Sequence, residues 1–77
     1  MDEAFAEIRV WHVPQNVPGS AHPYKCSLAY IMAGECVLRY DNEAGKGDHR
    51  HFGDVEEPYR FSTPEELIAD FWRDIDQ

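Results

Sequence analysis

The pattern of apolar and polar residues predicts extended structure over the first part of the chain. Residues 5–13 are rich in β-branched and aromatic side chains, and a period of two places Ile8 and Val10 on one face. The strand ends at Pro14, because proline lacks the backbone donor that a sheet ladder needs. Residues 15–23 combine proline, glycine, asparagine and serine, which predicts a long loop.

Two further apolar runs, residues 24–32 and 36–42, are separated by a stretch that suits a tight hairpin turn with Gly34 at a positive φ angle. Side-chain alternation through this turn gives one face with Ala29, Ile31, Cys36, Leu38 and Tyr40, and a second face with Cys26, Leu28, Tyr30, Met32, Val37, Arg39 and Asp41. The two cysteines fall on opposite faces, so we predict free thiols and no disulfide.

The end of the chain carries the signals of an amphipathic helix over residues 64–75. Thr63 is a good N-cap, Pro64 suits the first helical position, and Glu66 completes a capping box. The apolar residues recur at helical spacing and form one stripe: Leu67, Ile68, Phe71, Trp72 and Ile75. We expect this stripe, together with Trp11 of the first strand, to lie in the core.

Residues 48–53 resume an extended pattern, and a short stretch at 58–61 is compatible with one more strand. A chain of 77 residues buries only about 60% of its unfolded surface and supports one core, so we expect residues 1–77 to form a single domain. The predicted fold class is α+β, an antiparallel β-meander of about four strands with one C-terminal amphipathic helix packed on one face.

Charge is distributed unevenly along the chain. The formal net charge is -8 at pH 7, which argues against binding of nucleic acid through overall charge. Residues 8–53, however, carry five basic against four acidic side chains and all four histidines. The sequence contains no apolar run of about 18 residues and no secretory signal, so we expect a cytoplasmic protein that does not cross a membrane.

The candidate site lies in residues 40–53, where histidine, lysine and glycine are concentrated. If this segment ends in a strand, His49 and His51 project from one face at a separation of roughly 6 to 7 Å. Two imidazoles could then act as base and acid on an RNA phosphodiester without a metal ion, while nearby cations stabilise the phosphate charge. The catalytic candidates are His49, His51, Lys46, Arg39 and Asp48.

Three other interpretations fit the same segment. His49, His51 and Asp41 could bind a divalent metal ion, but a His-x-His pair alone supplies only two ligands, so no cofactor is predicted. Residues 45–47 could form a backbone nest that binds a phosphate without cleaving it. In the third interpretation the segment is a solvated turn, and its histidines pair with nearby carboxylates.

The sequence also resembles the TumE family of small bacterial toxin-antitoxin proteins. The resemblance rests on the segments AFAEIRVWHVP, PGSAHPYKCSLAYI, GECVLRYDNEAGKGDHRH, EEPYRF and LIADFWRDI, and it covers nearly the whole chain. Its most specific part is the run from Tyr40 to His51.

The resemblance implies a toxin that forms a cytosolic complex with a helix-turn-helix antitoxin. From the resemblance we expect a further segment before the first strand in family members that is missing here, and an edge exposed in this way would favour a homodimer. Combined with the site chemistry, the prediction is a toxin that acts on RNA through the His-x-His and lysine site. The alternative is a non-enzymatic interaction module, in which the acidic helix and the sheet edge bind a basic antitoxin or another protein partner.

Overall fold

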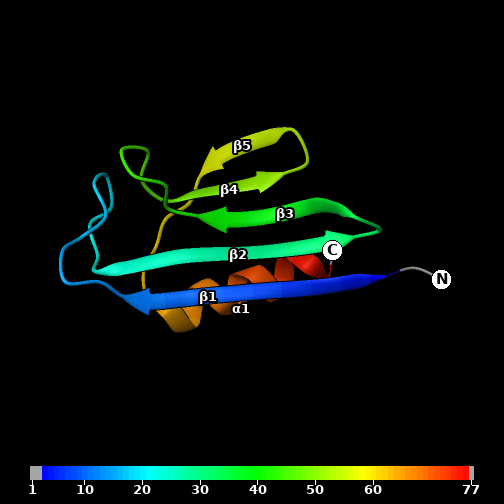
Figure 1. The fold of residues 1–77 in the computed structure, drawn as a ribbon, viewed down its shortest axis with the longest axis horizontal. Helices are drawn as coiled ribbons and strands as arrows, with labels where there is room; N and C mark the ends of the chain where they lie inside the picture. The colour runs from blue at the N-terminus through cyan, green and yellow to red at the C-terminus, as the bar shows by residue number, and fades with distance from the viewer. Residues whose placement is uncertain (1–2, 77) are drawn as a thin grey trace.

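The computed structural model describes residues 3–76, which form one antiparallel sheet and one helix (Figure 1). The elements are β1 Ala4–His12, β2 Tyr24–Met32, β3 Glu35–Asp41, β4 His49–Phe52, β5 Val55–Pro58 and α1 Pro64–Ile75. The strands follow one another across the sheet in the order β1-β2-β3-β4-β5. The predicted α+β meander with a C-terminal helix is confirmed, with five strands in place of about four. No helix within residues 3–76 has the length and apolar character needed to cross a membrane.

The fifth strand lies earlier than the stretch 58–61 that the sequence pattern indicated. β5 begins at Val55, which pairs with Phe52 of β4, so only two residues separate the strands. Gly53 opens this turn with a φ of 56°, a conformation that glycine adopts without strain. The strand forms because the tight turn places these residues against the free edge of β4, a pairing that the acidic sequence of the segment does not reveal.

The hairpin between β2 and β3 contains a β-bulge that changes the predicted faces. Pairing runs through Ile31 and Cys36, and then shifts so that Tyr30 faces Leu38 and Leu28 faces Tyr40. The assignment of Leu38 and Tyr40 to the face of Ile31 was therefore wrong. One extra residue in a strand reverses the side-chain alternation beyond it, and apolar side chains on both faces hid this shift.

Both cysteines are free thiols, as predicted. Cys26 is buried against the helix side of the sheet, whereas Cys36 is exposed. Burial raises the pKa of the Cys26 thiol to about 11, because the thiolate would lose its hydration there. Cys26 is consequently an inert core residue.

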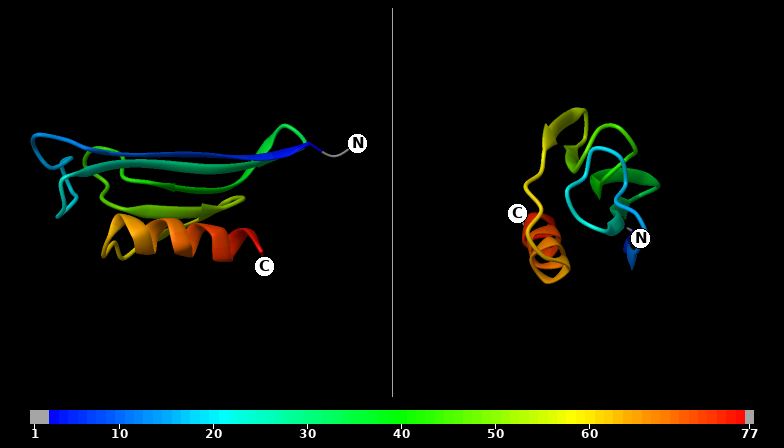
Figure 2. Two further views of the ribbon diagram at one scale, coloured as in Figure 1. Left: turned by 90° about the horizontal axis from the view of Figure 1, so that it is seen from below. Right: turned by 90° about the vertical axis from the view of Figure 1, so that its left-hand side faces the viewer.

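The helix begins as the capping signals predicted and covers one face of the sheet (Figure 2). The Thr63 hydroxyl accepts a hydrogen bond from the Glu66 amide at 3.0 Å. Buried apolar side chains from both layers form the core: Cys26, Leu28, Leu38, Tyr40, Leu67 and Phe71. Trp11 and Trp72 are each 46% exposed, so their assignment to the core was wrong.

A polar network fastens the helix to the sheet. Arg50 lies opposite Tyr40 in the ladder and shares its face, and both side chains donate hydrogen bonds to Asp74 of α1. Arg50 also donates to Glu57 of β5. Burial, and then the bond to Asp74, raise the pKa of Tyr40 to about 12, so the phenol stays neutral. The helix thereby occupies one face of the sheet, and the other face is left open.

Candidate functional site

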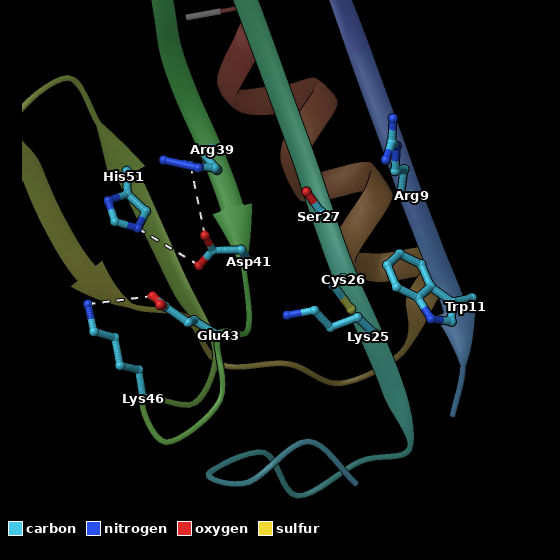
Figure 3. A pocket seen from close by; sticks show the side chains of 10 residues that line it. All are labelled: Arg9, Trp11, Lys25, Cys26, Ser27, Arg39, Asp41, Glu43, Lys46 and His51. Atoms are coloured by element: carbon cyan, nitrogen blue, oxygen red, sulfur yellow. Dashed lines mark ion pairs between the residues drawn. The ribbon is translucent and has the colours of Figure 1, made fainter. Parts of the chain in front are cut away.

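The open face of the sheet carries a hollow of about 630 Å³ (Figure 3). Its lining comes from β1 to β4 and the loop between β3 and β4: Arg9, Trp11, Lys25, Cys26, Ser27, Arg39, Asp41, Glu43, Lys46 and His51. Four of the seven Lys and Arg residues of the chain gather here, against two carboxylates. The hollow is therefore locally cationic in a protein whose net charge is -8.

The strand register explains why these side chains meet. Trp11 lies opposite Lys25, and Arg39 lies opposite His51, so each pair projects from the same face. Lys46 reaches the hollow from the loop that follows β3. The sheet thus collects cations that lie far apart in the sequence.

The cations of the hollow are only weakly committed to partners within the protein. Arg39 Nε lies 3.8 Å from an Asp41 oxygen, and Lys46 Nζ lies 3.7 Å from a Glu43 oxygen. The side chains of Arg39 and Lys46 are half exposed, and ion pairs at such positions contribute about 0 to 1 kcal/mol. A phosphate group can therefore exchange with these carboxylates at little cost.

His51 is the imidazole of the hollow. Its Nε2 lies 3.2 Å from a carboxylate oxygen of Glu56 and 3.9 Å from one of Asp41, and the side chain is 28% exposed. Both carboxylates approach Nε2 and can orient the ring, while the exposed part of the side chain remains accessible to a ligand. This arrangement suits transfer of a proton next to the guanidinium of Arg39.

His49 shares the strand face of His51 but does not line the hollow. Its Nδ1 lies 2.9 Å from the carbonyl oxygen of Gly47. Because a carbonyl oxygen only accepts hydrogen bonds, Nδ1 carries the proton in this contact, and Nε2 remains for other partners.

Asp48 lies outside the hollow, in a contact with the loop before β2. Its carboxylate oxygen lies 2.8 Å from Nε2 of His22, and both side chains are largely buried. The His22 ring stacks on Phe61 with the ring centroids 3.6 Å apart. Asp48 therefore ties three segments of the chain together at this end of the sheet.

The glycines around Lys46 allow two loops to pack backbone against backbone. The amide of Gly45 donates to the carbonyl of Pro18 at 2.6 Å, and a Cβ on Gly47 would lie 2.9 Å from the carbonyl oxygen of Gly19. The Lys46 amide donates to Glu43 within the loop. Two backbone amides of the suggested phosphate nest, those of Gly45 and Lys46, thus donate to carbonyl oxygens of the protein. The glycines instead allow this loop to pack against the loop before β2.

Buried Asn42 holds the beginning of this loop. Its side-chain oxygen accepts from the Cys26 amide at 2.8 Å, and its amide group donates to Tyr24 and Ser20. Lys25 Nζ in turn donates to the Asn42 carbonyl at 3.2 Å. These hydrogen bonds between Asn42 and β2 therefore fix the start of the loop that carries Lys46.

Within residues 3–76, no three His, Cys, Asp or Glu side chains come together closely enough to hold a metal ion. The alternative ligand set of His49, His51 and Asp41 is accordingly not assembled as a site.

The candidate residues thus separate into two groups. Arg39, Lys46 and His51 line one hollow with Asp41, whereas His49 and Asp48 do not line it. Sequence reasoning missed Arg9, Trp11 and Lys25, which also line the hollow. Arg9 and Trp11 share one face of β1, but only the pairing with β2 shows that Lys25 lies on the same face.

The molecule is thus a small α+β protein with a helix on one face of its sheet and a cationic, histidine-bearing hollow on the other. The family model described as Toxin TumE matches residues 1–77, so the chain belongs to the TumE toxin family. It is accordingly the toxin component of a toxin-antitoxin system, with an antitoxin as its partner. Comparisons with curated proteins and with solved structures gave no match.

Proposed function

We propose that this toxin acts on RNA in the bacterial cytoplasm, and that the open-face hollow is where it binds and cleaves a phosphodiester. The observation that carries the proposal is the position of His51 in a cationic hollow beside Arg39. RNA supplies both groups that such a site needs, an anionic phosphate and a neighbouring 2′-hydroxyl.

In the proposed reaction, His51 takes the proton of the 2′-hydroxyl, and the 2′-oxygen attacks phosphorus. The bond from phosphorus to the 5′-oxygen breaks, and that oxygen receives a proton from the second imidazole, His49. Because His49 lies on the strand face of His51 but outside the lining of the hollow, the leaving group must extend beyond the hollow to reach it. Arg39 and Lys46 stabilise the negative charge that develops on the phosphate oxygens. Asp48 acts indirectly, because its contact with His22 positions the segment before β4. The products are a 2′,3′-cyclic phosphate and a 5′-hydroxyl.

Expression in cells with and without the antitoxin tests this function. The wild-type chain should stop growth and fragment RNA, whereas His51→Ala should do neither. His12→Ala is the matched control, because His12 is exposed on β1 and contacts Tyr24, outside the hollow. RNA fragmentation by His51→Ala at the wild-type level would refute the role of His51.

The partner that we propose is a basic helix-turn-helix antitoxin. If the protein is a non-enzymatic interaction module, this contact is its whole function, and the exposed acids in the first turn of α1, Glu65 and Glu66, favour a basic partner. Asp70 and Asp74 are less suited to the contact, because they accept hydrogen bonds from Tyr59 and Tyr40 within the fold. Glu65→Lys with Glu66→Lys should weaken the antitoxin complex, and His51→Ala should leave toxicity unchanged if this alternative holds.

A homodimer through β1 completes the proposal. β1 is an edge of the sheet, and three of its large apolar residues are exposed: Phe5 at 52%, Ile8 at 37% and Trp11 at 46%. Antiparallel pairing of two copies about Ile8 would set Arg9 opposite the partner subunit's Glu7. The strand is thus complementary to itself in charge.

A further inference from the structure

Trp11 forms an exposed aromatic wall of the hollow. It lies opposite Lys25 in the ladder, on the face that the helix does not cover, and 46% of it is exposed. No aromatic ring within residues 3–76 stacks on it: the ring pairs of the described chain involve other residues. Packing within the fold therefore does not account for an indole at this position.

Cations and an imidazole continue from Trp11 across the sheet. Lys25 lies next to it on β2. Arg39 of β3 pairs with Ala29, four residues further along β2, and His51 lies opposite Arg39 on β4. Three strand spacings of about 4.8 Å across the sheet and a four-residue offset of about 13 Å along it separate the Trp11 and His51 backbones by roughly 19 Å, which is enough for a few nucleotides. An aromatic platform beside a cationic groove is the combination that binds single-stranded nucleic acid.

Electrostatics alone would hold RNA weakly here. The hollow contains four cations but also Asp41 and Glu43, and the whole chain carries a net charge of -8. Neutralising about two phosphates gives a salt dependence of only about -1.4 in log affinity against log salt. Most of the affinity must then come from a contact that is insensitive to charge, and stacking of a base on Trp11 provides one.

We propose that the hollow binds single-stranded RNA with one base stacked on Trp11 and the adjacent phosphodiester held by Lys25, while Arg39 holds a phosphate further along the strand. Bases in a duplex are stacked on one another and cannot reach the indole, so the site selects unpaired RNA. The inference rests on the proposed function, because it takes RNA as the target. To the proposed function it adds that the bound RNA is single-stranded and that Trp11 contacts one of its bases.

The experiment measures binding through the fluorescence of Trp11 itself. Trp72→Phe removes the other tryptophan, which lies on α1 away from the hollow, and His51→Ala in the same chain prevents cleavage. Titration with an oligoadenylate of about eight nucleotides should quench the emission of Trp11. The same length of RNA in a duplex should bind much more weakly. A fluorescent label on the RNA gives an independent affinity.

Substitution separates stacking from charge. Trp11→Leu should weaken binding of the single strand roughly 5- to 150-fold, while Trp11→Phe should retain most of the affinity. Trp72→Leu is the matched control, since Trp72 is equally exposed, and it should not change the affinity. Polyglutamate, a polyanion without bases, should neither bind tightly nor quench Trp11.

The inference would be overturned by equal affinity for duplex and single strand, by Trp11→Leu binding as the parent does, or by no binding at all. Its failure can be told from that of the proposed function. If His51→Ala abolishes RNA cleavage but Trp11→Leu cleaves like the wild type, RNA is the target and the stacking is wrong. If RNA binds with Trp11 quenched and the wild type never cleaves it, the binding site is correct and the catalysis is wrong.

Discussion

Arg50 and His51 are consecutive residues of β4 whose side chains serve opposite faces of the sheet. Arg50 donates hydrogen bonds to Asp74 and Glu57 on the helix side, whereas His51 lies in the hollow near Asp41 and Glu56. Alternation along one short strand thus places a structural residue beside a functional one. Mutations at the two positions should have separate consequences.

Arg50→Ala should destabilise the fold by about 1.5 to 3 kcal/mol, because it removes charge-assisted hydrogen bonds to Asp74 and Glu57. Arg73→Ala is the matched control, since Arg73 also pairs with a helix carboxylate but its side chain is 63% exposed. It should cost no more than about 1 kcal/mol. Urea unfolding measures both. Equal losses from the two substitutions would show that the Arg50 network does not hold the helix.

The bounds of the helix and of the first four strands followed from local sequence, but β5 and the site did not. Thr63, Pro64 and Glu66 signal the start of α1 directly, and the helix lies where the pattern predicted. The bulge in β3 shifts the pairing register between Tyr30 and Ile31, and apolar side chains on both faces hide this shift in the sequence. A local pattern therefore cannot tell on which side Leu38 and Tyr40 lie.

The same limit applies to the hollow. Its lining combines Trp11, Lys25 and His51, which come from three strands, and only the register brings them together. The concentration of histidine and glycine within residues 40–53 predicted a site in a segment that forms only one side of the hollow. The glycines there allow two loops to pack closely against each other. In the sequence, glycines with this role look the same as glycines of a phosphate-binding loop.

Stability should fall in alkaline solution as Tyr40 ionises. The folded state holds the phenolic proton more tightly than the unfolded chain, with a pKa of about 12 against 10.0. The stabilisation is fully present below pH 10 and is lost as the pH rises toward 12, a change of about 2 to 3 kcal/mol.

Urea midpoints measured across this range, with Tyr40→Phe for comparison, check the prediction. Cys26 ionises in an overlapping range, because its pKa of about 11 also lies above the value of 9.0 in the unfolded chain. The difference between wild type and Tyr40→Phe isolates the tyrosine. A constant difference from pH 9 to pH 12 would contradict the assignment.

Gly47→Ala should displace the loop that carries Lys46. Gly47 has a φ of 76°, and an added Cβ would meet the Gly19 carbonyl oxygen at 2.9 Å, so both backbone strain and a clash oppose the substitution. Gly45→Ala shares the strain at a φ of 86° but meets nothing within 4 Å.

Gly45→Ala should therefore cost about 1 to 2 kcal/mol, and Gly47→Ala should cost more and also lower RNA affinity. Unfolding and RNA titration measure the two effects. If both variants lose the same stability and bind RNA equally, the contact between Gly19 and Gly47 has no role in placing the loop.

Pairing of two copies through β1 can be tested by exchanging the charges of Glu7 and Arg9, which should first break and then restore the dimer. Glu7→Arg would place like charges opposite one another across the proposed dimer, which should convert dimers to monomers. Adding Arg9→Glu restores opposite charges in the antiparallel register and should restore the dimer. Sedimentation velocity measures the oligomeric state. A wild-type chain that is monomeric at high concentration contradicts the pairing.

Cleavage of a labelled RNA by purified toxin in the presence of a chelator tests the central claim most directly. The account predicts fragments that end in a 2′,3′-cyclic phosphate, produced by the wild type without a metal ion and absent with folded His51→Ala. Fragments of the same kind and amount from His51→Ala, or cleavage that requires an added divalent ion, would contradict it.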